Sequence, residues 1–358
     1  MTTRHSLSNE VCLGYLSALQ ASAIRIRQRK PLAATRRRTF PRGELRLEHI
    51  KRLAPLPEKR PATKSSKAFR SPIGAKTSPE GQPATGGISL PIHFITSDKE
   101  FRRPSQFRQP HSCSHVFSGR ALDRWDDKIL LASPALAFVQ EASRRSFIDT
   151  LCLGYEICGT YQQAVTPGAI VYQTHPLSST RDIRRLLKNN PSLPGAVQAR
   201  KALRYLADKS ASPRETQTAL LLGLPPYYGG YGLGIPSMNH KIHCTAEAAA
   251  IAGRKTLRCD LFWPAANLAV EYQSREFHTG EQQRVRDSRR TNALQSMGIQ
   301  VVAITNDELD CIDAVDVIAA TIRKAQKRRF RTSVGDYHRR KIKLRQQLGL
   351  PLRPRDAY

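Results

Sequence analysis

Acidic residues are scarce in this sequence of 358 residues: 29 Asp and Glu stand against 58 Lys and Arg, which gives a formal net charge of +29. An excess of this size disfavours a basic partner and indicates a polyanion, either nucleic acid or an acidic membrane surface. No amphipathic apolar face accompanies the positive charge, so nucleic acid is the better of the two interpretations.

The sequence also lacks any grouping of its seven cysteines. Neither a Cys-x-x-Cys pair nor a Cys/His cluster with zinc spacing occurs, which argues against a structural zinc ion and a disulfide framework. We interpret the cysteines as reduced, mostly buried thiols of a cytosolic protein. Long apolar runs are missing as well, so we expect a cytoplasmic protein with no signal peptide and no membrane partner.

The positive charge is concentrated at the two ends of the chain. Residues 1–70 carry a net charge of +13 and residues 322–358 a net charge of +11, which leaves +5 for residues 71–321. Runs such as Arg36-Arg37-Arg38 and Arg339-Arg340-Lys341 release counterions from a phosphate backbone without reading its sequence. The alternative is a pair of solvated tails without a specific partner.

Composition divides the chain into four segments. Residues 1–87, rich in Arg, Lys, Pro, Ser and Thr, predict a disordered basic arm with one helical stretch at about 9–27. Residues 88–210 predict a small α+β, partly helical domain of unknown role. Residues 211–327 predict an α/β domain, and residues 328–358 a basic C-terminal tail.

In the second segment, short apolar runs at 89–95, 115–117 and 128–132 predict strands. Ser133 as N-cap and Pro134 in the first helical position then predict a helix start, although the end of this helix is not defined by the pattern. Two further helices are predicted at about 182–188 and 196–207.

The third segment opens with a strong helix start. Ser212 is the predicted N-cap, Pro213 occupies the first helical position, and Glu215 completes a capping box three residues after the cap. A loop rich in Gly, Pro and Tyr ends this helix, and a first strand is predicted at 239–244.

Two runs of alternating apolar residues, at 257–263 and 267–273, are separated by a short turn and predict a β-hairpin. In the first run one face is apolar and the other is mixed; the apolar face comprises Leu257, Cys259, Leu261 and Trp263, and the mixed face Arg258, Asp260 and Phe262. The second run divides in the same way, with Leu268, Val270 and Tyr272 on one face and Asn267, Ala269, Glu271 and Gln273 on the other.

Burying both apolar faces together fixes the register of this hairpin and sets Asp260 directly opposite Glu271. Cross-strand partners have Cβ atoms roughly 4.5–5.5 Å apart, and two carboxylates at that distance repel each other. A hard divalent ion, Mg²⁺ or Mn²⁺, placed between them relieves the repulsion. The alternative is a solvent-facing surface on which Arg258 offsets the two negative charges.

The segment closes with a helix, a strand and a helix. A helix is predicted from Glu281 to Met297, with Gly298 as its left-handed cap. The run 299–305 is strongly apolar and predicts a strand buried on both faces. A final helix is predicted at about 312–327.

This order of elements, together with several motifs at matching spacing, resembles the PD-(D/E)XK nuclease superfamily. The motifs are Arg258-x-Asp260, Glu271-Tyr272-Gln273, His278, Arg286-Asp287-x-x-Arg290 and Gly298. Within that superfamily residues 210–325 resemble domains of unknown function related to very-short-patch-repair endonucleases, some of them in proteins linked to abortive-infection toxin–antitoxin systems. The resemblance implies a restriction-endonuclease-like αβββαβ core, with a central mixed four-stranded sheet flanked by helices.

The resemblance also implies roles for individual residues. Asp260 and Glu271 would bind Mg²⁺ or Mn²⁺, and Glu215 would add a third carboxylate, although its capping role is sufficient by itself. Gln273 stands where many members have Lys; it would orient the attacking water, but a neutral amide is no general base. His278 would carry a proton or be structural.

The arginines near these motifs are candidate phosphate ligands, namely Arg258, Arg284, Arg286 and Arg289. Asp287 and Arg290 lie one turn apart and are expected to pair on their helix. Three functions follow: a metal-dependent DNA endonuclease or nickase, a DNA-binding regulator of antitoxin type that has lost efficient cleavage, or a protein-interaction module whose basic ends serve solubility alone.

Overall fold

The computed structural model describes residues 10–28, 32–35, 38–39, 45–46, 49, 88–97, 103–163, 170–273, 281–329, 335–353 and 356. The chain divides into two compact units. The first comprises Met1–Ser71 and Lys76–Arg204, and the second Pro72–Ala75 and Tyr205–Tyr358. The division after Arg204 lies near the domain boundary predicted from composition at residue 210.

The first unit contains a six-stranded mixed sheet in the order β2-β5-β6-β1-β3-β4. Its strands are β1 (Val11–Leu13), β2 (Ala33–Ala34), β3 (Ile92–Thr96), β4 (Arg108–Ser112), β5 (Leu122–Arg124) and β6 (Ile129–Ala132). The runs predicted at 89–95 and 128–132 correspond to β3 and β6, whereas 115–117 is not a strand. The polar strand β4 was missed because it carries no apolar alternation.

The prediction of a disordered arm over residues 1–87 is wrong at its start. Val11, Cys12 and Leu13 are fully buried, and β1 lies inside the sheet, parallel to β6 and antiparallel to β3. Helix α1 (Tyr15–Arg27) follows at once and corresponds to the helical stretch expected there. The partner strands lie far along the chain, so composition near residue 11 does not reveal this pairing.

The helices of the first unit pack around α3 (Pro134–Ala142), whose N-cap Ser133 accepts the backbone N–H of Leu136 as predicted. The other helices are α4 (Phe147–Ile157), α5 (Thr180–Asn189) and α6 (Ala196–Ala202), and a small hairpin joins β7 (Tyr161–Gln162) to β8 (Val171–Tyr172). The sequence left the end of α3 undefined; the structure ends it at Ala142 and starts α4 after a second cap, Ser146.

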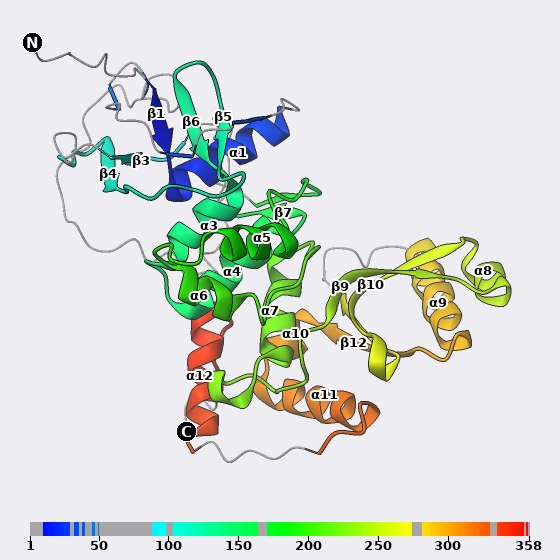
Figure 1. The fold of residues 1–358 in the computed structure, drawn as a ribbon. Coiled ribbons are helices and arrows are strands. Elements are labelled where there is room, and N and C mark those ends of the chain that lie inside the picture. The colour runs from blue at the N-terminus through cyan, green and yellow to red at the C-terminus, as the bar shows by residue number, and fades with distance from the viewer. Residues whose placement is uncertain are drawn as a thin grey trace, which may run out of the picture. The chain divides into compact units, whose positions relative to one another are not determined.

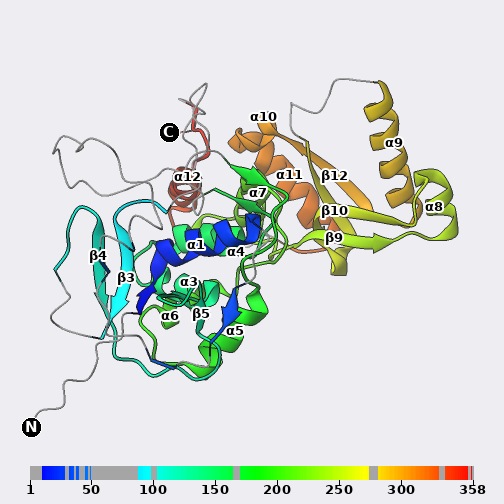
Figure 2. The ribbon, with the colours of Figure 1, turned by 90° about the horizontal axis from the view of Figure 1, so that it is seen from above.

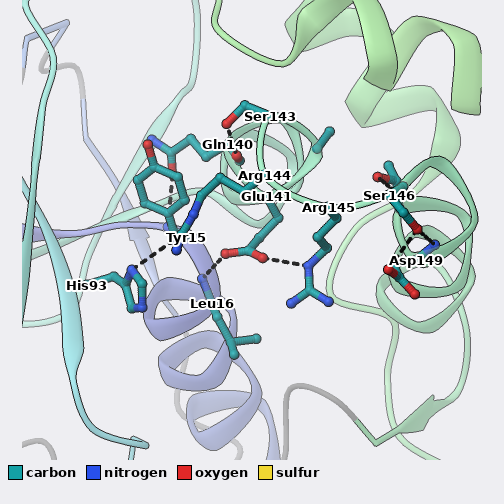
Figure 3. Close-up of polar contacts among 12 residues, drawn as sticks. Tyr15, Leu16, His93, Gln140, Glu141, Ser143, Arg144, Arg145, Ser146 and Asp149 are labelled. Atoms are coloured by element: carbon teal, nitrogen blue, oxygen red, sulfur yellow. Dashed lines mark hydrogen bonds and ion pairs between the residues drawn. The ribbon is translucent and has the colours of Figure 1, made fainter. Parts of the chain in front are cut away.

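Side chains from α3 hold the start of α1, as Figure 3 shows. Gln140 Oε1 accepts the backbone N–H of Tyr15, and Glu141 Oε1 accepts that of Leu16, each at 3.0 Å. The other oxygen of Glu141 pairs with Arg145 at 2.6 Å. Because Gly14 has no side chain to cap the helix, the amide oxygen of Gln140 and the buried carboxylate of Glu141 satisfy these orphan donors.

The second unit contains a four-stranded sheet in the order β12-β11-β10-β9. Its strands are β9 (Ser237–His243), β10 (Thr256–Trp263), β11 (Leu268–Gln273) and β12 (Gln300–Thr305). The pairs β9–β10 and β10–β11 are antiparallel, and β11–β12 is parallel. A mixed four-stranded sheet is therefore present, as the sequence predicted.

The helices of this unit follow the predicted order, and α8, α10 and α12 are present in addition. They are α7 (Pro213–Gly223), α8 (Ala246–Ala252), α9 (Glu281–Ser296), α10 (Asn306–Leu309), α11 (Ile312–Ala325) and α12 (Tyr337–Gln347), with 3-10 turns η1 (Pro226–Tyr228) and η2 (Pro264–Ala266). Figures 1 and 2 show α8 and α9 together at one part of the sheet, away from α7 and α11. Gly298, after α9, has the predicted positive φ of 73°.

Two expectations for the end of the chain are wrong. Strand β12 is at the edge of its sheet and is mostly half-exposed or exposed, not buried on both faces. Residues 328–358 are not simply a tail, because α12 lies within them and Leu344 and Leu348 are fully buried. The high density of basic residues in α12 hides the narrow apolar stripe by which it packs.

The core of this sheet shows that the alternation of β10 is interrupted. Leu257 and Cys259 share an apolar cluster with Phe262 rather than with Leu261, although the sequence predicted Phe262 on the opposite face. Residues of α8, α9 and β11 complete the cluster, including Ala248, Ala269, Ala293, Leu294 and Ile299. The alternation of faces along β10 therefore breaks between Cys259 and Phe262, next to the candidate site residue Asp260.

Within the described part of the chain, no helix combines the length and the apolarity needed to cross a bilayer.

Candidate functional site

The predicted register of the β10–β11 hairpin is confirmed next to its turn. Leu261 pairs with Val270 and Trp263 with Leu268. The backbone pairing of the two strands does not continue past Leu261 and Val270. There the backbone N–H of Tyr272 donates to Oδ2 of the Asp260 side chain, at 2.9 Å. A ladder pair between Asp260 and Glu271 is therefore not what brings the two carboxyls together.

On the other side of β10 the strand register passes from the pair Cys259–His240 to the pair Leu261–Met238. Asn239 is the residue between His240 and Met238, and it has a φ of 45°, which is uncommon for a residue other than glycine. The pairing of β9 with β10 is thus interrupted at Asp260 and Asn239 without a change of register, and the Asp260 carboxyl accepts a hydrogen bond from the neighbouring strand β11.

Glu215 enters the same place from helix α7. Its carboxylate accepts the backbone N–H of Ala211 at 3.0 Å, the hydroxyl of Ser212 at 3.1 Å and the side-chain amide of Asn239 at 2.6 Å. The backbone N–H of Glu215 donates to Ser212 Oγ, so the predicted N-cap is confirmed. Ser212 therefore caps α7, whereas the Glu215 carboxylate accepts the N–H of Ala211 rather than that of Ser212, so the predicted capping box is not completed; Glu215 instead ties the helix to Asn239 of β9.

Burial raises the pKa of all three carboxyl groups, and the charge of Asp260 raises the pKa of Glu215 and Glu271 further. Burial, and then the charge of Asp260, raise the pKa of Glu271 to about 8 and that of Glu215 to about 7. Burial also raises the pKa of Asp260, against the opposing effects of the Tyr272 N–H and the charge of Arg290. A cation at this place would stabilise all three ionised forms.

Arg290 of α9 supplies one such positive charge. Its Nη2 lies 2.5 Å from Glu271 Oε2 and also donates to the carbonyl oxygen of Arg258. The other carboxylate oxygen of Glu271, Oε1, is buried and has no hydrogen-bond partner. Cys259 lies beside this carboxylate, and burial followed by the charge of Glu271 raises the pKa of its thiol to about 12.

The donor set fits a hard divalent ion that is held only in part by protein. Mg²⁺ and Mn²⁺ favour carboxylate oxygens, and Mg²⁺ in enzyme sites takes one or two carboxylates plus water and phosphate oxygens. Asp260 and Glu271, whose Oε1 has no hydrogen-bond partner, offer oxygen donors of this kind. Among the described residues no group of three or more His, Cys, Asp or Glu is arranged to hold a metal ion.

The remaining predicted site residues are more dispersed. Gln273 is exposed at the end of β11, beside Thr305 of β12, and His278 lies outside the described residues. The candidate phosphate ligands Arg258, Arg286 and Arg289 are exposed on β10 and α9, and Arg284 is in α9 with its side chain outside the described part.

Sequence reasoning missed two residues at this site. Asn239 gave no signal, because only its positive φ marks the interruption of pairing in β9. Arg290 was expected to pair with Asp287 on its own helix, but its guanidinium reaches Glu271 on the sheet. This contact depends on how helix α9 packs on strand β11, and a sequence pattern within one helix does not indicate it.

The first unit has a separate group of titratable side chains that the sequence did not single out. His93 Nδ1 lies 2.8 Å from His111 Nε2, the ring of Tyr15 lies 3.8 Å from that of His111, and Arg144 Nη1 contacts His93 Nδ1 at 3.2 Å. Burial, followed by the charge of Arg144 for His93 and by His93 for His111, lowers their pKa to about 4 and about 3. Both rings are therefore neutral at pH 7.

Comparison with known proteins gives relatives without a described activity. No family model matches the sequence, and no solved structure matches it. Two uncharacterized proteins of Mycobacterium tuberculosis, from strains CDC 1551 and H37Rv, are each 30% identical over 115 residues. The matched part is 32% of this chain and 38% of each relative, so the chain spans well under half the length of the curated relatives it matches.

Proposed function

We propose that residues 205–358 form a divalent-metal-dependent DNA endonuclease or nickase, which hydrolyses phosphodiester bonds. The observation that carries this proposal is that the buried carboxyls of Glu215 and Glu271 both lie within electrostatic reach of Asp260, with pKa values of about 7 and 8. Such perturbed groups cluster at catalytic and metal-binding sites. The resemblance of residues 210–325 to the PD-(D/E)XK superfamily supports the same conclusion.

Each residue has a distinct role in the proposed reaction. Asp260, oriented by the Tyr272 N–H, and Glu271 through its Oε1 would hold Mg²⁺ or Mn²⁺. When bound, such an ion lowers the pKa of a water molecule and offsets charge on the scissile phosphate. Glu215 fixes Asn239, beside which the pairing of β9 with β10 is interrupted at Asp260.

DNA would meet this site over an exposed basic surface. Arg258, Arg286 and Arg289 are exposed on β10 and α9, whose residue Arg290 reaches the site. Guanidinium groups in such positions contact phosphates without reading bases. Gln273, exposed at the end of β11, orients water at most, because an amide does not remove protons at neutral pH.

A second candidate function is a DNA-binding regulator of antitoxin type that keeps the nuclease-like arrangement without efficient cleavage. Two observations favour it: a glutamine stands at position 273, and Arg290 already neutralises one oxygen of Glu271. In this case DNA affinity would depend on salt but not on a divalent ion.

The two functions are separated by a nicking assay on supercoiled plasmid with Mg²⁺ or Mn²⁺. We expect wild-type protein to nick and the variants Asp260→Asn and Glu271→Gln to be slower by about 100-fold or more. Glu247→Gln, an exposed carboxylate on α8, is the matched control and keeps full activity. Equal nicking by all variants, or none by wild type with several substrates and metals, contradicts a nuclease; DNA binding insensitive to EDTA would then support the regulator.

A further inference from the structure

The turn η1 and helix α12 together expose a cluster of aromatic and basic side chains in the second unit. Tyr227 is 60% exposed, an unusual value for so large a ring. Its ring meets that of Tyr228 edge-on at 5.0 Å, and Tyr228 meets Tyr205 edge-on at 5.8 Å. The half-buried rings of Tyr205 and Tyr228 therefore support one ring that faces solvent.

Arg340 of α12 fixes the orientation of this exposed ring. Its guanidinium lies 5.0 Å from the centre of the Tyr227 ring, and its Nη1 donates to the carbonyl oxygen of Tyr227 at 2.8 Å. One arginine thus contacts both the ring and the backbone of the same tyrosine. These two contacts hold the Tyr227 ring in place while most of the residue stays exposed to solvent.

The loop beneath the ring is packed backbone to backbone against α12. A Cβ at Gly229, where φ is 92°, would come within 2.1 Å of the carbonyl oxygen of Arg340, and one at Gly230 within 2.2 Å of that of Leu224. The hydroxyl of Tyr337 also donates to the carbonyl oxygen of Gly230 at 2.9 Å. Such close contacts make the platform rigid, so little conformational entropy is lost when something stacks on it.

The exposed side of α12 is positively charged, with Asp336 at its N-cap and Asp316, the partner of Lys341, as the acidic groups next to it. Helix α12 contains no acidic residue, and its Arg339 and Lys343, four positions apart, are both exposed on one side. The opposite side of the helix packs through Leu344 and Leu348, which are fully buried. An exposed aromatic ring with a stripe of cations beside it matches a base and its flanking phosphates.

We propose that this platform, defined by Tyr205, Tyr227, Tyr228, Arg339, Arg340 and Lys343, binds single-stranded nucleic acid. An unpaired base stacks on Tyr227, and the phosphates on either side of it contact Arg339 and Lys343. A continuous duplex presents no free base face to the ring, so the platform distinguishes single strands from duplex. The proposal does not depend on the carboxylate site, because it requires no metal and no cleavage.

Binding of a short fluorescein-labelled oligothymidylate, followed by anisotropy in EDTA, tests the proposal on the full-length chain. We expect Tyr227→Ala to weaken binding by roughly 5- to 100-fold, as the loss of one base-stacking contact does, and Tyr227→Phe to bind like wild type. Lys343→Gln lowers the slope of log affinity against log salt by about 0.7, and Tyr227→Ala leaves that slope unchanged. Val317→Ala, an equally exposed apolar residue on α11, is the control.

A local readout separates this platform from the other basic segments of the chain. Tyr227→Trp places an indole on the platform, and we expect the oligonucleotide to quench its emission, whereas Val317→Trp is not quenched. Wild-type affinity in Tyr227→Ala, loss of binding in Tyr227→Phe, absence of quenching in Tyr227→Trp, or equal affinity for a duplex of the same length would each overturn the proposal. Failure of the nicking assay leaves this result unaffected, so the two proposals are tested separately.

Discussion

The guanidinium of Arg290 lies 2.5 Å from Oε2 of Glu271 and joins the long helix α9 to strand β11. Glu271 is 7% exposed, and its second oxygen, Oε1, has no hydrogen-bond partner. The positive charge of Arg290 therefore offsets the cost of burying the ionised carboxylate. The same carboxylate is the proposed metal ligand. A divalent ion bound as proposed would therefore stabilise the same ionised group that Arg290 stabilises through Oε2.

Replacing Arg290 by Gln tests this relationship. The Arg290 side chain is one-third exposed, so we expect a loss of about 1–2 kcal/mol in the free energy of unfolding, below the roughly 3–5 kcal/mol of a fully buried pair. Mn²⁺ should recover more stability in the variant than in wild type, because the carboxylate has lost its other cation. Thermal unfolding with and without Mn²⁺ measures both effects. The exposed neighbour Arg289→Gln is the control, and an identical response to Mn²⁺ in all three proteins contradicts the arrangement.

Glu215 should make the folded protein less stable as the pH rises. Its pKa is about 7 in the folded state against 4.5 for the free group, because burial and then Asp260 raise it. The folded state holds the proton more tightly, so this contribution to stability is fully present below pH 4.5 and is lost as the pH rises to about 7. Glu215→Gln should flatten the pH dependence over that interval by about 1–3 kcal/mol.

Urea unfolding at several pH values between 4.5 and 8 checks this expectation. Glu271 titrates in an overlapping interval, with a pKa of about 8, so part of the slope remains in the variant. Glu247→Gln, exposed on α8, serves as the reference substitution. An unchanged slope in Glu215→Gln would mean that this carboxyl is ionised at neutral pH in the folded protein.

The hairpin of the second unit was predictable because its signals are local. Alternation and a short turn fix the pairs Leu261–Val270 and Trp263–Leu268. Ser212 and Gly298 likewise mark a helix start and a helix end through backbone chemistry that acts within a few residues. These elements bring Asp260 and Glu271 into the same part of the sheet.

What could not be predicted depends on contacts between distant residues. The pairing of Val11–Leu13 with β3 and β6 joins strands separated by about eighty residues or more, and three apolar residues in a basic setting give no local signal. Phe262 joins the cluster of Leu257 and Cys259, and Asn239, with its positive φ, contacts Glu215 from helix α7; strict alternation along β10 indicates neither feature.

Divalent-ion affinity should increase with pH if Asp260 and Glu271 are the ligands. A metal binds the ionised carboxylates, and the pKa of Glu271 is about 8, so each unit of pH below that value weakens binding by up to about tenfold. Titration with Mn²⁺, followed by the loss of the free-ion electron paramagnetic resonance signal, measures this at pH 6 and pH 8. Asp260→Asn should abolish the tight site, and Glu247→Gln should leave it intact. An affinity independent of pH would assign the ion to other ligands.

Helix α12 is expected to be essential for the stability of the second unit, although its composition is that of a solvated tail. Leu344 is fully buried, and next to it Arg345, only 1% exposed, donates to the carbonyl oxygens of Leu309 and Pro351. Truncating a leucine in such a place removes buried surface and leaves a cavity, so Leu344→Ala should cost about 2–5 kcal/mol in the free energy of unfolding. Lys343→Ala, on the exposed side of the same helix turn, should cost less than about 0.5 kcal/mol. Chemical denaturation of the two variants measures the difference, and equal stability would mean that α12 contributes nothing to the folded unit.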